Sequence, residues 1–240
     1  MTPERLAAFW VYLQTGPLLW LTLTLAAYGL AQALARRARF HPLVNPVAIA
    51  VALLVAVLVL TDTPYARYFE GAQFVHFLLG PATVALAVPL WRHRAAVREA
   101  LVPMAIALFA GSATAVLSAV AIARLLGASR ETIVSLAPKS ATTPIAMAVA
   151  EKLGGLPSLT AVLVIATGIL GAMTAGPLLD RLRVHEPRAR GLAIGLAAHG
   201  IGTARAFWES PLCGTFAGIA MAANGVATAL LAPFLLAWLR

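Results

Sequence analysis

Charged residues, and acidic ones above all, are scarce in this sequence. Asp, Glu, Lys and Arg make up 11% of the 240 residues, only 9 residues are acidic, and 61% are hydrophobic. An ordinary soluble domain, in which about a quarter of the residues are charged, is therefore excluded. Because a membrane span needs about 20 largely apolar residues, we expect an all-α integral membrane protein of about seven to eight membrane segments.

Cysteine and catalytic motifs are also lacking. The single cysteine, Cys213, excludes an internal disulfide framework and offers no pair of thiolates to a metal. The sequence has no Gly-x-Ser-x-Gly elbow, no His-Glu-x-x-His motif and no paired intramembrane aspartates. We therefore expect no enzyme, no metal site and no cofactor. Residues 1–16 also lack the pattern of a cleavable signal.

The net charge of +9 resides mainly in short loops between apolar runs. These runs predict spans at 17–35, 44–60, 74–90, 100–126, 157–179, 191–207 and 216–239. The basic loops are 36–39, 92–98 and 181–190. If all three are cytoplasmic, the N-terminus lies outside a cell (inner) membrane and the C-terminus lies in the cytoplasm. The positive charge thus concerns orientation in the lipid bilayer and predicts no nucleic-acid partner.

A polar stretch with two prolines interrupts the apolar sequence after Glu131. Pro138 lacks an N–H group and disfavours helical geometry before it, so a helix from Glu131 should end or kink there. Thr143 as N-cap and Pro144 at the first helical position predict a new helix. Its free N–H groups, together with Lys139, would attract an anion. The alternative is a simple proline kink, with a lysine that reaches the headgroups.

The number of crossings constrains the same stretch. Four spans precede Arg130, which places that loop outside. For the basic loop 181–190 to lie inside, residues 131–156 must enter the membrane and return on the outer side. We therefore predict a re-entrant pair of half-helices over 131–156. A full crossing, with one basic loop on the wrong side, is the alternative.

A weak internal repeat is present within what we expect to be one membrane domain, 1–240. Residues 111–117 (GSATAVL) match residues 225–231 (GVATALL), and the same offset brings the predicted helix break at Gly80, Pro81 and Thr83 near the segment of His199. This predicts pseudo-repeats 43–126 and 157–239 of opposite orientation, with the broken segment between them. Inverted repeats with interrupted helices are typical of secondary transporters. Chance similarity in a Gly/Ala/Leu-rich sequence is the alternative.

A second polar cluster follows at His199-Gly200-Ile201-Gly202-Thr203-Ala204-Arg205. A helix break at Gly200 and Gly202 would let His199, Thr203 and Arg205 share one site. Arg205 could bind a carboxylate in bidentate fashion, or pair instead with helix carbonyls or sit beside Glu209. His199 could couple proton movement or serve only as a hydrogen-bonding group. Asn224, within the last span, could bind a substrate group through its amide or support the residues that bind it.

Several motifs, in this order, resemble the LrgB/CidB family over about residues 43–236. They are Asn45-Pro46, Tyr68-Phe69-Glu70-Gly71, Leu79 to Leu90, Pro138 to Ala146, Gly155 to Ala161 and His199 to Ala206. The family carries the name murein hydrolase effector or holin/antiholin-like protein, and usually works beside a smaller LrgA/CidA-type membrane partner. A related plastid protein exports glycolate and glycerate, and bacterial members are linked to pyruvate and similar carboxylates. The resemblance therefore implies a monocarboxylate carrier or a regulator of cell-wall hydrolysis.

The first hypothesis is a secondary transporter of small monocarboxylates such as glycolate, glycerate or pyruvate. Lys139, Arg205 and the helix start at Thr143 would hold the carboxylate. The remaining candidate binding residues are Ser140, Thr142, His199, Gly202, Thr203 and Asn224. The alternative is an antiholin-like regulator of autolysis with an LrgA/CidA-like partner. Polar groups gathered at two breaks disfavour a self-sufficient pore. A homodimer is the default oligomer.

Overall fold

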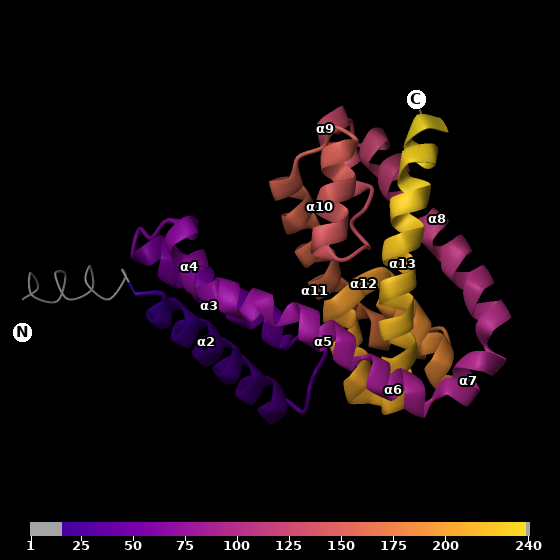
Figure 1. Cartoon of the computed structure of the whole chain (residues 1–240), viewed down its shortest axis with the longest axis horizontal. Helices are drawn as coiled ribbons and strands as arrows, with labels where there is room; N and C mark the ends of the chain where they lie inside the picture. The colour runs from indigo at the N-terminus through magenta and orange to yellow at the C-terminus, as the bar shows by residue number, and fades with distance from the viewer. Residues whose placement is uncertain (1–15, 239–240) are drawn as a thin grey trace, which may run out of the picture. The chain divides into compact units, whose positions relative to one another are not determined.

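The computed structural model describes residues 16–238, and all regular elements in that range are helices (Figure 1). This confirms the all-α class. The helices are α2 (Pro17–Arg37), α3 (Pro46–Leu60), α4 (Tyr65–Phe77), α5 (Leu79–Ala85), α6 (Ala87–Arg92), α7 (Arg94–Glu99), α8 (Leu101–Leu125), α9 (Arg130–Leu136), α10 (Thr143–Lys152), α11 (Pro157–Arg181), α12 (Pro187–Glu209) and α13 (Pro211–Trp238).

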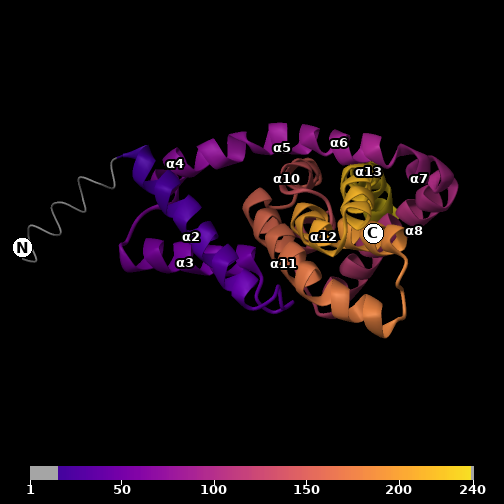
Figure 2. The same ribbon diagram turned by 90° about the horizontal axis from the view of Figure 1, so that it is seen from below.

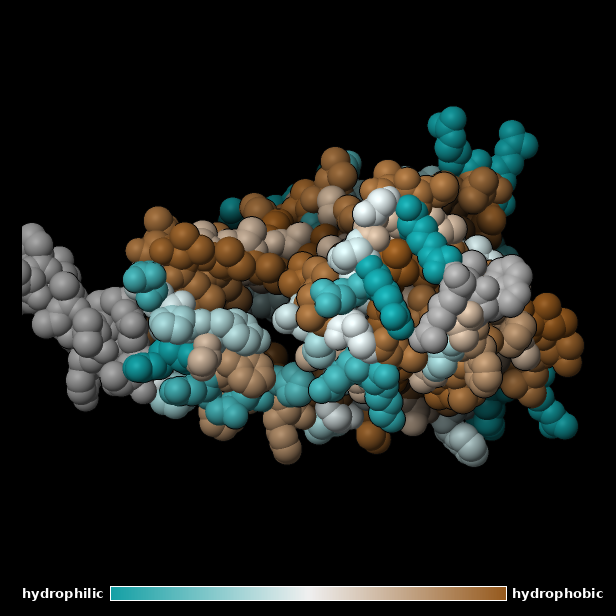
Figure 3. All heavy atoms as spheres, turned by 90° about the horizontal axis from the view of Figure 1, so that it is seen from above, coloured by the Kyte–Doolittle hydropathy of each residue, from teal (hydrophilic) through white to brown (hydrophobic). Residues whose placement is uncertain are grey.

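Five helical stretches are long and apolar enough to cross a membrane. They are Pro17–Arg37, Tyr65–Arg92, Leu101–Leu125, Pro157–Arg181 and Pro211–Ala237, and the shorter Pro46–Leu60 is also apolar. Large apolar side chains are widely exposed, for example Leu60 at 85% and Leu125 at 86%. Broad apolar areas cover the face seen in Figure 3. Such a surface suits lipid, so the protein is a multispanning membrane protein.

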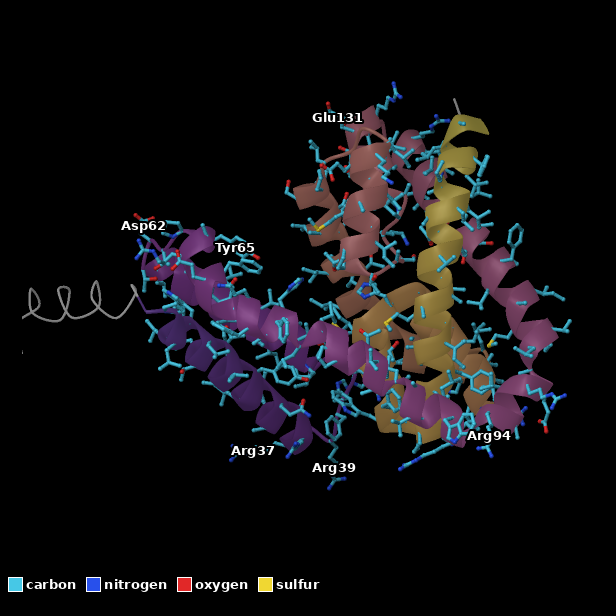
Figure 4. The ribbon with its side chains drawn as sticks, in the orientation of Figure 1. Arg37, Arg39, Asp62, Tyr65, Arg94 and Glu131 are labelled. Carbon is cyan, nitrogen blue, oxygen red and sulfur yellow. The ribbon has the colours of Figure 1, made fainter. Side chains whose placement is uncertain are left out.

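The chain forms two compact units, the first ending at Ala85 and the second beginning at Leu86. In the first unit α3 connects α2 to α4, and Asn45 Oδ1 caps α3 by accepting hydrogen bonds from the N–H groups of Val47 and Ala48 at 2.9 and 3.1 Å. Figure 4 shows Arg37 and Arg39 at one end of these helices and Asp62 and Tyr65 at the other. The single domain 1–240 stays a prediction.

Helix α4 packs closely on α2 in the first unit. Gly71 has no room for a side chain, because Pro17 O and Trp20 Cβ occupy the place of a Cβ atom. Trp20 is only 1% exposed and meets the ring of Tyr68 edge-on, with centroids 6.1 Å apart. Trp10, Tyr12 and Trp20 lie near the start of the first predicted span, as interfacial aromatic residues do; for Trp20 this stays a prediction, and Trp10 and Tyr12 lie outside the described residues. The predicted break at Gly80 and Pro81 corresponds to a turn at Leu78, and both residues begin α5.

The packing of α8, α11 and α13 in the second unit shows how these three long helices run relative to one another. Met104 and Leu108 of α8 pack with Phe216 and Ala220 of α13, and Val116 and Val120 pack near the far end of α13, at Leu235 and Leu236, so α8 and α13 run parallel. The end of α11, at Leu179, packs with the start of α13, so α11 runs the opposite way. The matched stretches 111–117 and 225–231 therefore have the same orientation, not opposite ones. The wider correspondence of 43–126 with 157–239 stays a prediction.

Helix α12 reverses direction at its centre. Arg190 and Glu209 would be about 28 Å apart in a straight helix, yet Arg190 Nε lies 2.8 Å from Glu209 Oε2. The reversal occurs at Ala198 (φ −124°, ψ 15°) and His199 (φ 39°, ψ −131°). We call α12 hairpin B, with arms 187–197 and 200–209. The predicted span 191–207 was therefore wrong, since the chain turns back one residue before Gly200.

Hairpin B lies between α11 and α13 (Figure 2). Its first arm contacts the backbone of α13 at two glycines one helical turn apart. A Cβ atom at Gly191 would meet the carbonyl oxygen of Cys213, and one at Gly195 would meet that of Ala217. The absence of side chains at these two positions therefore permits the backbones to touch.

A second hairpin, hairpin A, is formed by α9, α10 and the tip 137–142 between them. The N–H of Leu156 donates to Ser135 Oγ at 2.8 Å, so the chain returns beside the end of α9. Helix α9 ends before Pro138, as predicted. The predicted N-cap was wrong by one residue: Thr142 occupies the cap, Thr143 is the first helical residue and Pro144 the second, because the extended backbone ends at Thr142 (ψ 148°).

The two hairpins open toward opposite ends of the second unit. Arg188 pairs with Glu99 at 3.2 Å, which places the loops 92–98 and 181–190 at one end. Glu131 of hairpin A lies at the other end, away from Arg94 (Figure 4). Helix α13 leads away from the 181–190 end, because hairpin B returns to that end and does not cross. The predicted cytoplasmic C-terminus is therefore incompatible with a cytoplasmic loop 181–190.

These elements form an inverted structural repeat. Helices α8 and α11 both have 25 residues, and α11 begins 56 residues after α8. Hairpin A spans residues 130–152 and hairpin B spans 187–209, which is the same length at an offset of 57. Each long helix is followed by its hairpin, and the two pairs run in opposite directions.

Candidate functional site

The tips of the two hairpins meet at Asn224, a fully buried residue at the middle of α13. Asn224 Nδ2 donates to the carbonyl of Ser140 on hairpin A at 2.9 Å and to that of Leu196 on hairpin B at 3.2 Å. Its Oδ1 accepts from Ser112 Oγ of α8 at 2.6 Å and from Thr228 Oγ1 at 3.3 Å. One amide thus joins α8, α13 and both tips.

The turn of hairpin B is fixed by His199. Its Nε2 lies 2.9 Å from the carbonyl oxygen of Val164 on α11, and its own carbonyl accepts from Thr203 Oγ1 at 2.8 Å. A positive φ at a non-glycine residue is strained. Gly168 makes room for the ring, because a Cβ atom there would lie 2.5 Å from His199 Cε1. His199 is therefore held by packing and by two hydrogen bonds.

Lys139 supplies a positive charge at the tip of hairpin A. Its side chain is half-buried and Nζ lies 3.4 Å from Ser140 Oγ. None of the ion pairs in residues 16–238 involves Lys139. Two half-helices also begin at the tips, α10 at Thr143 and the second arm of hairpin B at Gly200, and the first N–H groups of a helix have no helical acceptor. The tips thus combine an ammonium group with two helix starts, which is suitable for an anion.

Arg205 lies elsewhere. Its guanidinium is near Gly176 of α11, with Nη2 3.9 Å from the place of a Cβ atom, and 5.8 Å from the Trp208 ring. The tip of hairpin A packs against α11 at Val164, and twelve helical residues from Val164 to Gly176 correspond to about 18 Å. The structure therefore does not bring Arg205 to Lys139.

An ionic cluster closes the base of hairpin B. Arg190 binds Glu209 on the other arm at 2.8 Å, Asp180 at the end of α11 at 2.6 Å, and the carbonyl of Val184 at 3.0 Å. The hydrogen bond to Glu209, followed by that to Asp180, raises the pKa of the Arg190 guanidinium above its usual range. This cluster belongs to the base of the hairpin and is separate from the tips.

Most of the other candidate residues lie on one of the two hairpins, and Thr83 lies elsewhere. Thr142 and Thr143 are half-buried at the start of α10. Gly202 and Thr203 are buried inside hairpin B, where a Cβ at Gly202 would lie 2.6 Å from Ala198 Cβ. Thr83 belongs to α5 in the first unit and donates to Leu79 O at 2.7 Å. No cluster of three or more His, Cys, Asp or Glu side chains suited to a metal occurs in residues 16–238.

Sequence reasoning missed Ser112 and the carbonyl groups of Val164 and Leu196. Ser112 is a hydroxyl residue near the middle of a predicted span, and this position was a usable signal. Backbone carbonyls carry no such signal, because their exposure depends on where a helix breaks.

Comparisons with known proteins agree on one family. The model of the LrgB-like family matches residues 24–238. The chain is 37% identical over 195 residues to the uncharacterized protein YwbG of Bacillus subtilis, covering 81% of this chain and 87% of that protein. It is 34% identical to an uncharacterized protein of Haemophilus influenzae (88% and 91% covered) and 29% identical to the antiholin-like protein LrgB of Bacillus cereus (90% and 94% covered). No solved structure matches.

Proposed function

The chain belongs to the LrgB-like family, and from that premise we propose that it is a secondary transporter of small monocarboxylates such as glycolate, glycerate or pyruvate. The observation that carries this proposal is the meeting of two oppositely directed hairpins at Asn224, next to Lys139, whose ammonium joins none of the ion pairs within residues 16–238. Inverted repeats with broken helices around a central site are typical of secondary transporters.

The position of the tips supports transport. Ser112 is near the middle of α8 and Asn224 near the middle of α13, both of which are candidate spans. Irregular backbone at that depth is stable only where protein or a wet cavity satisfies its polar groups. Two hairpins that enter from opposite sides leave a thin barrier between the two faces, and small movements of either tip could open it.

The roles of the residues follow from their places. The Lys139 ammonium and the free N–H groups at Thr143 and Ile145 would hold the carboxylate. The hydroxyl groups of Ser140, Thr142 and Thr143 would face the hydroxyl or carbonyl group of the substrate. His199, Gly202 and Thr203 would act by shaping hairpin B, and Arg205 would act at its base.

The charge pattern supports one orientation. With the basic loops 92–98 and 181–190 in the cytoplasm, hairpin A enters from outside a cell (inner) membrane and hairpin B from the cytoplasm. The re-entrant form predicted for 131–156 is part of this proposal. The end of α13 then lies outside. We further propose a homodimer, the commonest oligomer, and an association with an LrgA/CidA-like membrane protein.

An antiholin-like regulator of murein hydrolase activity is the second candidate. It is favoured by the name of a relative, the antiholin-like protein LrgB of Bacillus cereus, which matches 90% of this chain. A regulator would act through a partner in the membrane and would need no substrate site. Membership of the family is compatible with transport and with regulation of murein hydrolase activity. A measurement of solute transport by the purified protein distinguishes these two functions.

Uptake into proteoliposomes tests the proposal. Purified protein should give saturable uptake of labelled glycolate, glycerate, pyruvate or lactate. Lys139→Ala should abolish this uptake, whereas Lys152→Ala, an exposed lysine at the end of α10, should not. No saturable uptake of any of these substrates, under several pH gradients, would contradict transport. If deletion of the gene nevertheless changed autolysis, the second candidate would replace the first.

A further inference from the structure

The geometry points to Asn224 as a positioning residue, which fixes the two hairpin tips against each other and does not touch the substrate. This inference rests on the proposed function for its effect on transport. The tie between the tips can be measured without transport. The sequence left two roles open for Asn224, binding of a substrate group and support of the residues that bind it, and these two roles make different predictions.

Asn224 has no free hydrogen-bonding capacity for a substrate. Its side chain is 0% exposed. An amide offers two N–H donors and an oxygen with two lone pairs, and the structure shows two bonds donated by Nδ2 and two accepted by Oδ1. A carboxylate at the tips would find no vacant atom on Asn224.

Both carbonyls that Asn224 binds lose their helical partner at a break. A helical bond to Ser140 O would come from the nitrogen of Pro144, which has no hydrogen. A helical bond to Leu196 O would come from the N–H of Gly200, which lies beyond the turn at Ala198 and His199. Each of these two carbonyls thus loses its helical donor, and Asn224 gives one amide hydrogen to each at 2.9 and 3.2 Å.

The position of Asn224 outside the repeat supports this role. The repeat comprises α8 with hairpin A and α11 with hairpin B, and α13 follows it. A residue on α13 can therefore contact both tips without belonging to either. Because hairpin A carries Lys139 and the start of α10, and hairpin B carries the other helix start at Gly200, the tie sets the distance between the anion-holding groups of hairpin A and the tip of hairpin B.

Loss of the tie should weaken the binding of every substrate by the same factor. We expect Asn224→Ala to raise KM for glycolate, pyruvate and lactate by a common factor of about tenfold, because two buried hydrogen bonds are lost and no substrate contact is removed. Thr228→Val removes a neighbouring bond to Asn224 Oδ1 but leaves both tip bonds, so it is the matched control.

The tie itself is tested by the distance between two spin labels. Cys213 is replaced by Ala, and labelled cysteines are introduced at the exposed residues Ala148 of hairpin A and Ala197 of hairpin B. The protein with Asn224 should show one narrow distance by double electron–electron resonance. Asn224→Ala should broaden or shift it, and Thr228→Val should not. If Asn224→Ala fails to accumulate in membranes, Asn224→Leu, of similar volume, replaces it.

The possible outcomes distinguish a failure of the positioning role from a failure of the proposed transport function. An unchanged narrow distance in the Asn224 variant, or a rise in KM for only some of the carboxylates, would overturn the positioning role. If the protein with Asn224 transports nothing, the proposed function fails. The distance measurement still decides the inference in that case.

Discussion

Ser112 on α8 donates a hydrogen bond of 2.6 Å to Asn224 on α13, and both side chains are fully buried. The two residues are near the middle of parallel candidate spans. The bond therefore joins α8 to the residue that holds both hairpin tips.

Removal of this hydroxyl should destabilise the protein modestly. We expect Ser112→Ala to lower the free energy of unfolding by about 1 kcal/mol, because Asn224 Oδ1 keeps only the longer bond from Thr228. Ser118→Ala, on the exposed side of the same helix, is the control and should change little. Thermal unfolding in detergent measures both variants, and equal stability of the two would contradict the importance of the Ser112 bond.

Substitution of Gly168 should disturb His199. A methyl group at Gly168 would lie 2.5 Å from His199 Cε1 and 2.8 Å from Nε2, so the ring must leave the carbonyl of Val164. We expect Gly168→Ala to lower stability by about 1–3 kcal/mol through overpacking. Gly29→Ala in α2 has open space and should raise stability by about 0.5–1 kcal/mol. A gain of stability at Gly168 would show that the packing around His199 is looser than described.

The base of hairpin B should depend on Arg190. Arg190→Ala leaves Glu209 half-buried without its partner, so we expect a loss of about 2–3 kcal/mol in unfolding free energy. Arg188→Ala removes a more exposed pair with Glu99 and should cost at most about 1 kcal/mol.

The pKa of Arg190 adds a pH test of the same cluster. The hydrogen bond from Arg190 to Glu209 raises the pKa of its guanidinium in the folded protein above its usual value. The stabilisation is therefore complete below that value and is lost only at more alkaline pH. The stability difference between the protein with Arg190 and Arg190→Ala should accordingly stay constant from neutral to mildly alkaline pH. A difference that shrinks in this range would contradict the assignment.

Lys139 and Arg205 should differ in their effect on transport. Lys139→Gln removes the ammonium at the tips and should reduce kcat/KM by about 100-fold, corresponding to about 3 kcal/mol. Arg205→Gln acts about 18 Å away along α11 and should change KM by less than about threefold. Initial uptake rates over a range of substrate concentrations measure both. If Arg205→Gln raised KM as much as Lys139→Gln, the site would have to include the base of hairpin B.

Much of hairpin A could be predicted from the sequence, because its signals are local. Pro138 ends the preceding helix through its own backbone chemistry, and the Thr-Thr-Pro sequence predicts the start of the next helix to within one residue. Hairpin B could not be predicted in the same way. The break predicted at Gly200 and Gly202 falls earlier, at Ala198 and His199, and the positive φ of His199 is a conformation typical of glycine. The pairing of Arg190 with Glu209 across the two arms joins residues 19 positions apart in sequence, which a local signal does not indicate.

In the candidate site, too, some features could be predicted from the sequence and others could not. Lys139 could be found because a charge in an apolar sequence is rare. The separation of Arg205 from Lys139 could not be predicted, because it follows from the reversal at His199. The second arm of hairpin B runs back from this turn toward the end at which the first arm begins. The role of Asn224 depends on two carbonyls released by breaks in other helices, and no residue type indicates such groups.

The close approach at Gly191 and Gly195 has a consequence for motion. Where the backbone of hairpin B rests directly on the carbonyl groups of Cys213 and Ala217, no side chains remain that could slide or change rotamer between them. Hairpin B and α13 should then move as one rigid body. Any rocking that alternately exposes the centre to the two sides of the bilayer must be taken up by hairpin A, which that body holds through the Asn224 amide and through apolar packing at Leu235 and Leu236.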